Sequence, residues 1–210
     1  GQKLVSETDL KKAASLPWVN TPNNPSPEMR KRLRHYQTRV LGIDWGGGGE
    51  AKVSFTTLAL LGMTPDGKID VLWGKRLVIS QEHLREALEC MHWTSQFGCD
   101  IVTHDYTGAG TVRETVMVQA GFDLDRVMGM QYVRAATRNL MTHVPASILH
   151  NRSFHRLDKT RSLLYTCQAI KLGLLRFFQW DKQSDDNPGL IADFLALIEV
   201  GRYAERTDAF

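Results

Sequence analysis

The spacing of apolar residues becomes regular after residue 38. The first elements that it predicts along the chain are strands. Apolar runs rich in β-branched and aromatic residues predict strands over 39–44, 53–61 and 69–79. The turn Thr64-Pro-Asp-Gly67 has proline and Asp-Gly at the positions that a chain reversal favours. The three strands should therefore form an antiparallel meander.

Helices and single strands alternate in the rest of the chain. Helical spacing predicts a helix capped by Ser80, a helix from Thr111 to Ala120, a helix from Asp158 to about Leu174, and a final helix from Pro188 to Val200. Strands are predicted over 101–105 and 126–133, and an irregular segment around Pro145 follows them. This order predicts a central mixed α/β sheet flanked by helices, in which parallel strands are added to the meander through helical crossovers.

Residues 1–38 have a different composition, with prolines at 17, 22, 25 and 27. They predict a linker or N-terminal extension with one short helix over about 7–15. A chain of 210 residues can bury one core of ordinary size, so we expect a single folded domain over 39–210.

The composition is that of a soluble globular protein, with 42% hydrophobic and 23% charged residues. No apolar run is long enough to cross a bilayer, and the N-terminus does not resemble a signal peptide. The three cysteines are widely spaced and form no CxxC pair. They argue against a zinc ribbon or a disulfide scaffold and favour a reducing compartment.

Two aspartates occupy equivalent places at the ends of apolar strands. Asp44 ends the first strand before four glycines, and Asp105 ends the fourth strand before Tyr106-Thr-Gly-Ala-Gly110. Glycine-rich turns allow a metal or a phosphate to approach the backbone closely. The predicted order of elements resembles the ribonuclease H-like layout, in which the first and fourth strands are neighbours, so Asp44 and Asp105 should meet. The alternative is that each aspartate only caps a turn.

A third carboxylate lies in the predicted final helix. Asn187 suits its N-cap, and Asp193 shares a face with Leu190 and Leu197. A buried carboxylate must be paired, neutralised or bound to a metal. Asp185 and Asp186 directly precede the helix and either favour its positive end or join the site. Three clustered carboxylates suit a pair of divalent cations that hydrolyse a phosphodiester.

The net charge of +3 is mild, but basic residues are concentrated in two segments. One segment covers residues 30–35, and the other covers residues 134–161. Within the second segment Arg138, Lys159 and Arg161 are candidate contacts to DNA phosphates. The alternative for each segment is a solvated surface.

Three motifs of this sequence, taken in chain order, resemble the motifs of a known family. Gly42-Ile-Asp-Trp-Gly46, Asp105-Tyr-Thr-Gly-Ala-Gly110 and Ala192-Asp-Phe-Leu-Ala-Leu197 resemble motifs in the nuclease domain of tailed-bacteriophage terminase large subunits, which has a ribonuclease H-like fold. The resemblance covers roughly residues 39–200. It implies an endonuclease that cuts concatemeric double-stranded viral DNA with little sequence specificity. It also implies that Asp44, Asp105 and Asp193 are catalytic residues that bind two Mg²⁺ or Mn²⁺ ions.

One departure from the family pattern concerns the third motif. The family often has two consecutive aspartates there, whereas Ala192 precedes Asp193 in this chain. Asp186 is therefore a further candidate metal ligand. The resemblance also implies a motor ATPase domain in the same polypeptide. No GxxxxGK[ST] motif occurs in this sequence, so we expect that domain to be absent here. The resemblance implies two protein partners, the portal and the small terminase subunit. It implies the host cell cytoplasm as the location.

Two other functional classes fit parts of the pattern. A phosphotransferase of the actin and sugar-kinase type also begins with a strand-end aspartate and a glycine-rich turn, but it needs two such domains. A ribonuclease H-like module without activity would only bind nucleic acid or a protein. Transposases and Holliday-junction resolvases share the fold and differ in their motifs.

Overall fold

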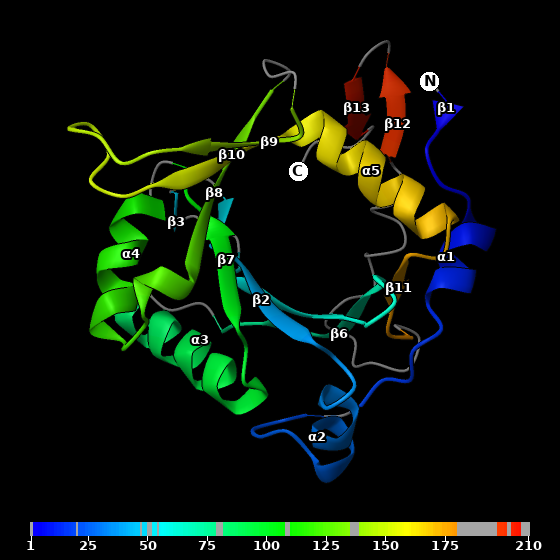
Figure 1. The fold of residues 1–210 in the computed structure, drawn as a ribbon, viewed down its shortest axis with the longest axis horizontal. Helices are drawn as coiled ribbons and strands as arrows, with labels where there is room; N and C mark the ends of the chain where they lie inside the picture. The colour runs from blue at the N-terminus through cyan, green and yellow to red at the C-terminus, as the bar shows by residue number, and fades with distance from the viewer. Residues whose placement is uncertain are drawn as a thin grey trace.

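The fold is given by a computed structural model that describes residues 2–19, 21–46, 48–49, 52–53, 55–78, 82–107, 110–134, 139–179, 197–200 and 203–206. Within these residues, eight strands form a mixed sheet in the order β11-β6-β5-β2-β7-β8-β10-β9 (Figure 1). The strands are β2 (Thr38–Asp44), β5 (Thr57–Met63), β6 (Ile69–Arg76), β7 (Ile101–Asp105), β8 (Val127–Val133), β9 (Met141–Val144), β10 (Phe154–Asp158) and β11 (Leu175–Phe177).

The arrangement of the strands confirms the predicted sheet. Strands β2, β5 and β6 are joined by antiparallel pairing, as expected for the meander. Strand β7 is parallel to β2, and β8 is parallel to β7. Helices α3 (His83–Phe97) and α4 (Gly110–Gln119) supply the crossovers. The mixed α/β topology therefore follows from the order of elements along the chain.

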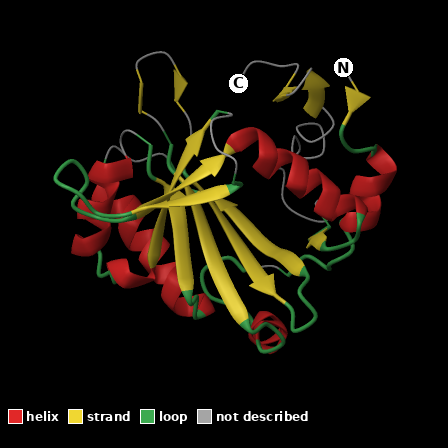
Figure 2. Cartoon of the chain, turned by 45° about the horizontal axis from the view of Figure 1, so that its top comes forward, coloured by secondary structure: helices red, strands yellow, loops and turns green. Residues whose placement is uncertain are grey.

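Helices cover both faces of the sheet. Helices α3 and α4 lie on one face, whereas α5 (Lys159–Lys171), with α1 (Glu7–Ala13) against it, lies on the opposite side (Figures 1 and 2). The short 3-10 helix η1 (Leu124–Arg126) leads into β8. In the part of the chain that is described, no helix is long and apolar enough to cross a membrane.

The two faces of the sheet carry different side chains at its centre. Large apolar residues such as Leu41, Leu60 and Trp73 face α3 and are at most 1% exposed, and Trp73 packs against Trp93 and Phe97. This packing forms the main core. On the α5 side the alternate positions hold small or polar residues, including Gly42, Ala59 and Thr103. Because these residues fill little volume, they leave space between the sheet and α5.

The N-terminal segment packs onto this domain. The short helix expected over about 7–15 is present as α1, where Ser6 forms a capping box with Asp9. A second helix, α2 (Pro27–Leu33), was not predicted, although Ser26 caps it and proline occupies its first position. Leu10 and Met29 are fully buried. Whether residues 1–38 connect the domain to another one stays a prediction.

Several boundaries differ from the sequence-based expectation. The segment predicted as one strand over 53–61 overlaps two separate strands, β4 (Lys52–Val53), which pairs with β3 (Gly48–Gly49), and β5. The N-cap of α3 is Glu82, and the predicted cap Ser80 lies outside the described residues. The segment predicted as irregular contains β9 and β10. Helix α5 ends at Lys171, because Gly173 has a positive φ of 70° and the chain then enters β11.

The predicted final helix does not extend to Val200. Leu197–Val200 is instead strand β12, paired antiparallel with β1 (Gln2–Lys3) and with β13 (Tyr203–Arg206). Backbone hydrogen bonds to both neighbours replace those that a helix would make. The rest of the predicted helix, including Asp193, lies outside the described residues.

Candidate active site

Asp44 and Asp105 lie beside each other at the centre of the sheet. They are the last residues of β2 and β7, which are adjacent parallel strands in which Ile43 pairs with His104. Continuing this register by one residue places the two aspartates on the same rung, and neighbouring strands are about 4.8 Å apart. The side chains of one rung point to the same face. The sequence-based expectation that these two aspartates meet is therefore confirmed.

Both carboxylates lie at a cavity of about 650 Å³ between the sheet and α5. Asp44 reaches the solvent at this cavity, and Asp105 is partly buried. The side chains around them are mostly small or polar, apart from Met130, Leu157 and Leu163. The residues with polar side chains on this face, besides the two aspartates, are Thr57, Thr103, Tyr132, Lys159, Ser162 and Thr166.

The turn after Asp105 explains the glycine that ends its motif. The Thr107 backbone N–H donates a hydrogen bond of 2.8 Å to Asp105 Oδ1 and orients the carboxylate. The start of α4 then passes so close to β7 that a Cβ at Gly110 would overlap the Asp105 carbonyl group. Any larger residue there would displace the end of the strand that carries Asp105. Glycine is needed at this position for close packing rather than for an unusual φ.

The electrostatics of the cavity disfavour two bare carboxylates. Burial by the surrounding protein, followed by the charge of Asp105, raises the pKa of Asp44, and Lys159 opposes this shift. Burial also raises the pKa of Tyr132, and Asp105 and Asp44 add to that effect. These directions are those expected for partly buried acids that lie beside other negative charges. Sequence reasoning missed Tyr132. It shares one face of β8 with Met128 and Met130, which lie at every second position before it.

The chemistry of the two acids fits a divalent cation. Mg²⁺ and Mn²⁺ prefer carboxylate oxygens as ligands. The described charges that act on Asp44 are those of Asp105 and Lys159, and no described hydrogen-bond donor lowers its pKa. A cation between the two carboxylates would remove their repulsion. Asp44 and Asp105 are therefore the residues that would hold it.

The remaining predicted site residues divide into three groups. Lys159 lies at the cavity, where its charge acts on Asp44. Arg161 is exposed in the first turn of α5, and its backbone N–H bonds to the N-cap residue Asp158. Arg138, Asp186 and Asp193 lie outside the described residues, as does Asp185. Within the described residues, no cluster of three or more His, Cys, Asp or Glu side chains could hold a metal.

One member of the predicted basic segment has a different role. Arg152 makes an ion pair with Glu114, with 2.7 Å between Arg152 Nε and Glu114 Oε2. Its guanidinium is therefore engaged inside the protein. His104 lies on the α4 side of β7 and is 2% exposed, so it packs there and does not enter the cavity. Sequence reasoning missed Glu114, because its partners are distant in the chain.

Comparisons with known proteins give structural matches. No family model matches the chain. No curated protein matches it either. The nuclease of the large terminase from thermophilic phage G20c has a TM-score of 0.57 at 8% identity, with 99% of this chain and 90% of that chain covered. The human cytomegalovirus terminase nuclease domain has a TM-score of 0.55 at 14% identity, with 94% and 88% covered.

A third similar structure is the nuclease domain of the large terminase subunit of bacterial virus Sf6. It has a TM-score of 0.56 at 11% identity, with 99% of this chain and 88% of that chain covered. One point mutant of the Sf6 domain is known with manganese and beta-thujaplicinol, and also with calcium. At these identities the likeness establishes the fold. This chain therefore has the ribonuclease H-like fold of the terminase nuclease domains.

Proposed function

We propose that this chain is a metal-dependent endonuclease that cuts double-stranded DNA with little sequence specificity. The observation that carries the proposal is the pair Asp44 and Asp105, on neighbouring strands at one cavity. The terminase nuclease fold supports the same activity. In the family that the motifs resemble, this nuclease cuts concatemeric genomes during viral DNA packaging.

Each side chain at the cavity has a distinct part in this reaction. Asp44 and Asp105 would hold the Mg²⁺ or Mn²⁺ ions at the cavity. Two such ions, when bound, activate the attacking water and stabilise the leaving oxygen. Lys159 attracts the phosphate to the same place, since its charge already acts on Asp44. Tyr132 lies at the cavity as a hydroxyl that can hydrogen-bond to the substrate.

DNA binding is proposed to follow the phosphate backbone. Lys159 lies at the cavity, Arg161 lies two residues further along α5, and Arg138 belongs to the same basic segment of the sequence. Contacts to phosphates position a duplex without reading its sequence. The low sequence specificity of the proposed nuclease follows from this kind of contact.

The wider context is proposed from the same resemblance. This chain covers 36% of the HK97 bacteriophage large terminase, which it matches with a TM-score of 0.53 at 10% identity. A nuclease that is part of a longer polypeptide with a motor ATPase domain would account for that fraction. The portal and the small terminase subunit are then partners, and the host cell cytoplasm is the location.

The test is cleavage of a supercoiled plasmid by the purified chain. With Mn²⁺ or Mg²⁺ the plasmid should be nicked and then linearised, and a chelator should stop the reaction. Cleavage should not require ATP. A folded protein that binds DNA but stays inactive with both metals would favour the non-catalytic module, whereas ATP hydrolysis would favour the kinase-like alternative.

The third metal ligand is the subject of a separate prediction. Asp193→Ala should abolish cleavage and the stabilisation of the protein by Mn²⁺, whereas Asp186→Ala should only weaken both. The expectation rests on the match of residues 192–197 to the third family motif, which contains Asp193 and not Asp186. Cleavage assays and thermal melting with and without Mn²⁺ measure both effects. An inactive Asp186 variant beside an active Asp193 variant would reverse the assignment.

A further inference from the structure

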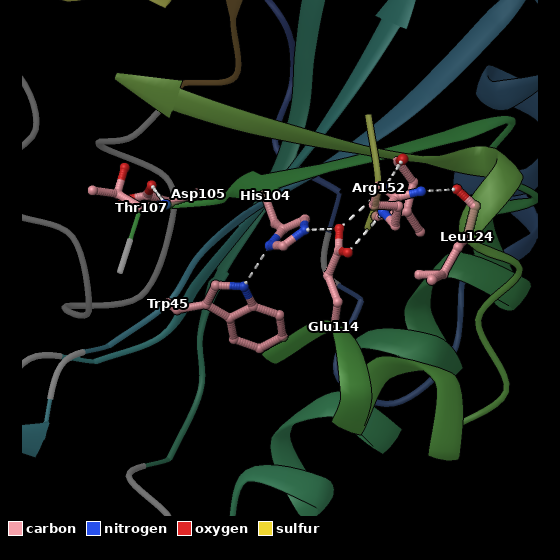
Figure 3. A network of polar contacts seen from close by, with 8 residues as sticks. Trp45, His104, Asp105, Thr107, Glu114, Leu124 and Arg152 are labelled. Carbon is pink, nitrogen blue, oxygen red and sulfur yellow. Dashed lines mark hydrogen bonds and ion pairs between the residues drawn. The ribbon is translucent and has the colours of Figure 1, made fainter. Parts of the chain in front are cut away.

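The residues next to the two site aspartates are joined on the other face of the sheet. Trp45 follows Asp44, and His104 precedes Asp105. The Trp45 indole Nε1–H donates a hydrogen bond of 3.0 Å to His104 Nδ1 (Figure 3). Because successive residues of a strand point to opposite faces, Asp105 faces the cavity while His104 faces α4. The hydrogen bond therefore links the ends of β2 and β7 directly behind the two carboxylates.

The partner of His104 fixes how its ring is protonated. An indole N–H can only donate, so His104 Nδ1 is the acceptor and Nε2 carries the proton. Nε2 lies 2.9 Å from Glu114 Oε1 in α4 and donates to it. The His104 side chain is fully buried, so water does not compete for either nitrogen. His104 is thus held from both sides in one orientation.

Glu114 is anchored in turn by Arg152. Arg152 Nη2 donates to Glu114 Oε1 at 3.0 Å, beside the ion pair through Nε. Burial opposes ionisation of Glu114, but the bonds from His104 and Arg152 outweigh it and lower its pKa. Arg152 also donates to the carbonyl oxygens of Leu124 and Val127, at 2.9 and 2.7 Å. The chain of contacts thus extends to the start of β8 (Figure 3).

A second set of contacts holds the turn after Asp44. The Arg113 guanidinium lies 4.9 Å from the centre of the Trp45 ring, and Arg113 Nη2 donates to the Gly46 carbonyl oxygen at 3.2 Å. Arg113 Nη1 also pairs with Glu86 at 2.7 Å. Thr56 joins Glu86 to the Gly46 backbone N–H through hydrogen bonds of 3.0 and 2.9 Å. The two residues after Asp44 are therefore restrained from α3 and α4.

Stability alone does not explain such a buried polar network. Apolar residues of similar volume commonly stabilise a core as well as buried ion pairs do, because they avoid the cost of desolvation. What hydrogen bonds add is a defined geometry. A defined geometry is needed here, since two like charges on one rung repel each other and would spread the strand ends.

We propose that Trp45, His104, Glu114 and Arg152 are positioning residues that hold the Asp44 and Asp105 carboxylates at the separation required to share a divalent cation. The inference rests on the proposed function for the identity of the ligand. It concerns the affinity of the site for metal, which can be measured without DNA. In this proposal the two carboxylates at the cavity bind the ion, and the network on the opposite face of the sheet fixes the distance between them.

The test compares two tryptophan-to-phenylalanine variants of the whole chain. Trp45→Phe removes the indole N–H that bonds to His104. Trp93→Phe removes the same atoms from a core tryptophan whose Nε1 has no hydrogen-bond partner among the described residues. Free Mn²⁺ measured by electron paramagnetic resonance gives the affinity of each protein. Trp45→Phe should bind Mn²⁺ roughly 10-fold more weakly than the natural chain, as is typical when a group that orients a metal ligand is lost. Trp93→Phe should bind it normally.

Glu114 provides the rescue experiment if Trp45→Phe does not fold. Glu114→Gln keeps an oxygen that can accept from His104 Nε2, whereas Glu114→Ala does not. The glutamine variant should therefore retain more Mn²⁺ affinity than the alanine variant at equal helical content. Equal losses would assign the effect to packing and overturn the positioning role.

Two outcomes separate this inference from the proposed nuclease activity. If the natural chain binds Mn²⁺ but cuts no DNA, the nuclease proposal fails, and the loss of affinity in Trp45→Phe still supports the network. If folded Trp45→Phe binds Mn²⁺ within about 2-fold of the natural chain, the positioning role is wrong even where DNA is cut. A natural chain that binds no Mn²⁺ would overturn both.

Discussion

Asp44→Asn should reduce metal-dependent DNA cleavage by more than about 100-fold while leaving the protein folded. Loss of a group that only orients a metal ligand costs about 10- to 100-fold, so loss of a ligand itself should exceed that range. A neutral amide can replace neither the charge nor the second oxygen of the carboxylate. Initial rates of plasmid nicking with saturating Mn²⁺ measure the loss, and circular dichroism checks the fold.

The same substitution should stabilise the protein when a chelator is present. The pKa of Asp44 is raised in the folded chain, first by burial and then by Asp105, above its ordinary value of 3.8. The ionised carboxylate therefore destabilises the fold at neutral pH, and that cost disappears as the pH falls towards the unfolded value. Asp44→Asn should raise the melting temperature at pH 7, with a gain that shrinks on acidification.

Asp66→Asn is the matched control for this stability effect. Asp66 lies in an exposed turn, where the hydrogen bond from Thr64 lowers its pKa, so its substitution should not raise the melting temperature. If Asp44→Asn instead melts at a lower temperature and keeps its activity, Asp44 is a structural cap. The proposed metal site would then be wrong.

Asp70→Ala should lower the free energy of unfolding by about 3 kcal/mol. Asp70 is fully buried in β6, and Arg176 of β11 donates to both of its oxygens, at 2.7 and 2.8 Å. Tyr36 donates a third hydrogen bond, at 2.6 Å. Alanine would leave the Arg176 guanidinium and the Tyr36 hydroxyl without their partner. The estimate is at the lower end for broken buried pairs because the Arg176 side chain is 34% exposed.

Urea denaturation measures this effect, with Asp66→Ala as control. Asp66 lies in the turn between β5 and β6, and its side chain is 65% exposed, so its removal should leave the midpoint nearly unchanged. Asp70 does not line the cavity, so cleavage by the folded Asp70→Ala protein at low temperature should be normal. A midpoint equal to that of the natural chain would show that the edge strand β11 does not depend on this pair.

The sequence alone determined the central strands and the meeting of two aspartates. Short apolar runs marked β2, β5 and β7, because these central strands are covered by the rest of the protein. The ribonuclease H-like layout that this order of elements resembles then placed Asp44 beside Asp105, and the pairing of β2 with β7 agrees. Helix α5 was also readable, since Asp158 has the side chain of an N-cap and occupies that place.

Only the tertiary structure decided which polar residues act together. Glu114 and Arg152 are 38 positions apart, and no local pattern marks their contact. Lys159 and Arg152 belong to the same basic segment of the sequence, yet the fold places Lys159 at the carboxylates and pairs Arg152 inside the protein. Local sequence shows the sign of a charge. Its partner depends on elements that approach from elsewhere in the chain.

Tertiary structure also decided the edges and the C-terminal strand. Strands β9 and β10 are short and about half of their residues are polar, so they carry too little apolar signal to be recognised. Leu197–Val200 reads as the end of a helix by its apolar spacing, but it pairs with Gln2–Lys3 at the other end of the chain. The conformation of such a segment depends on its hydrogen-bond partners, because its local propensity is weak and pairing with a distant strand satisfies its backbone groups equally well.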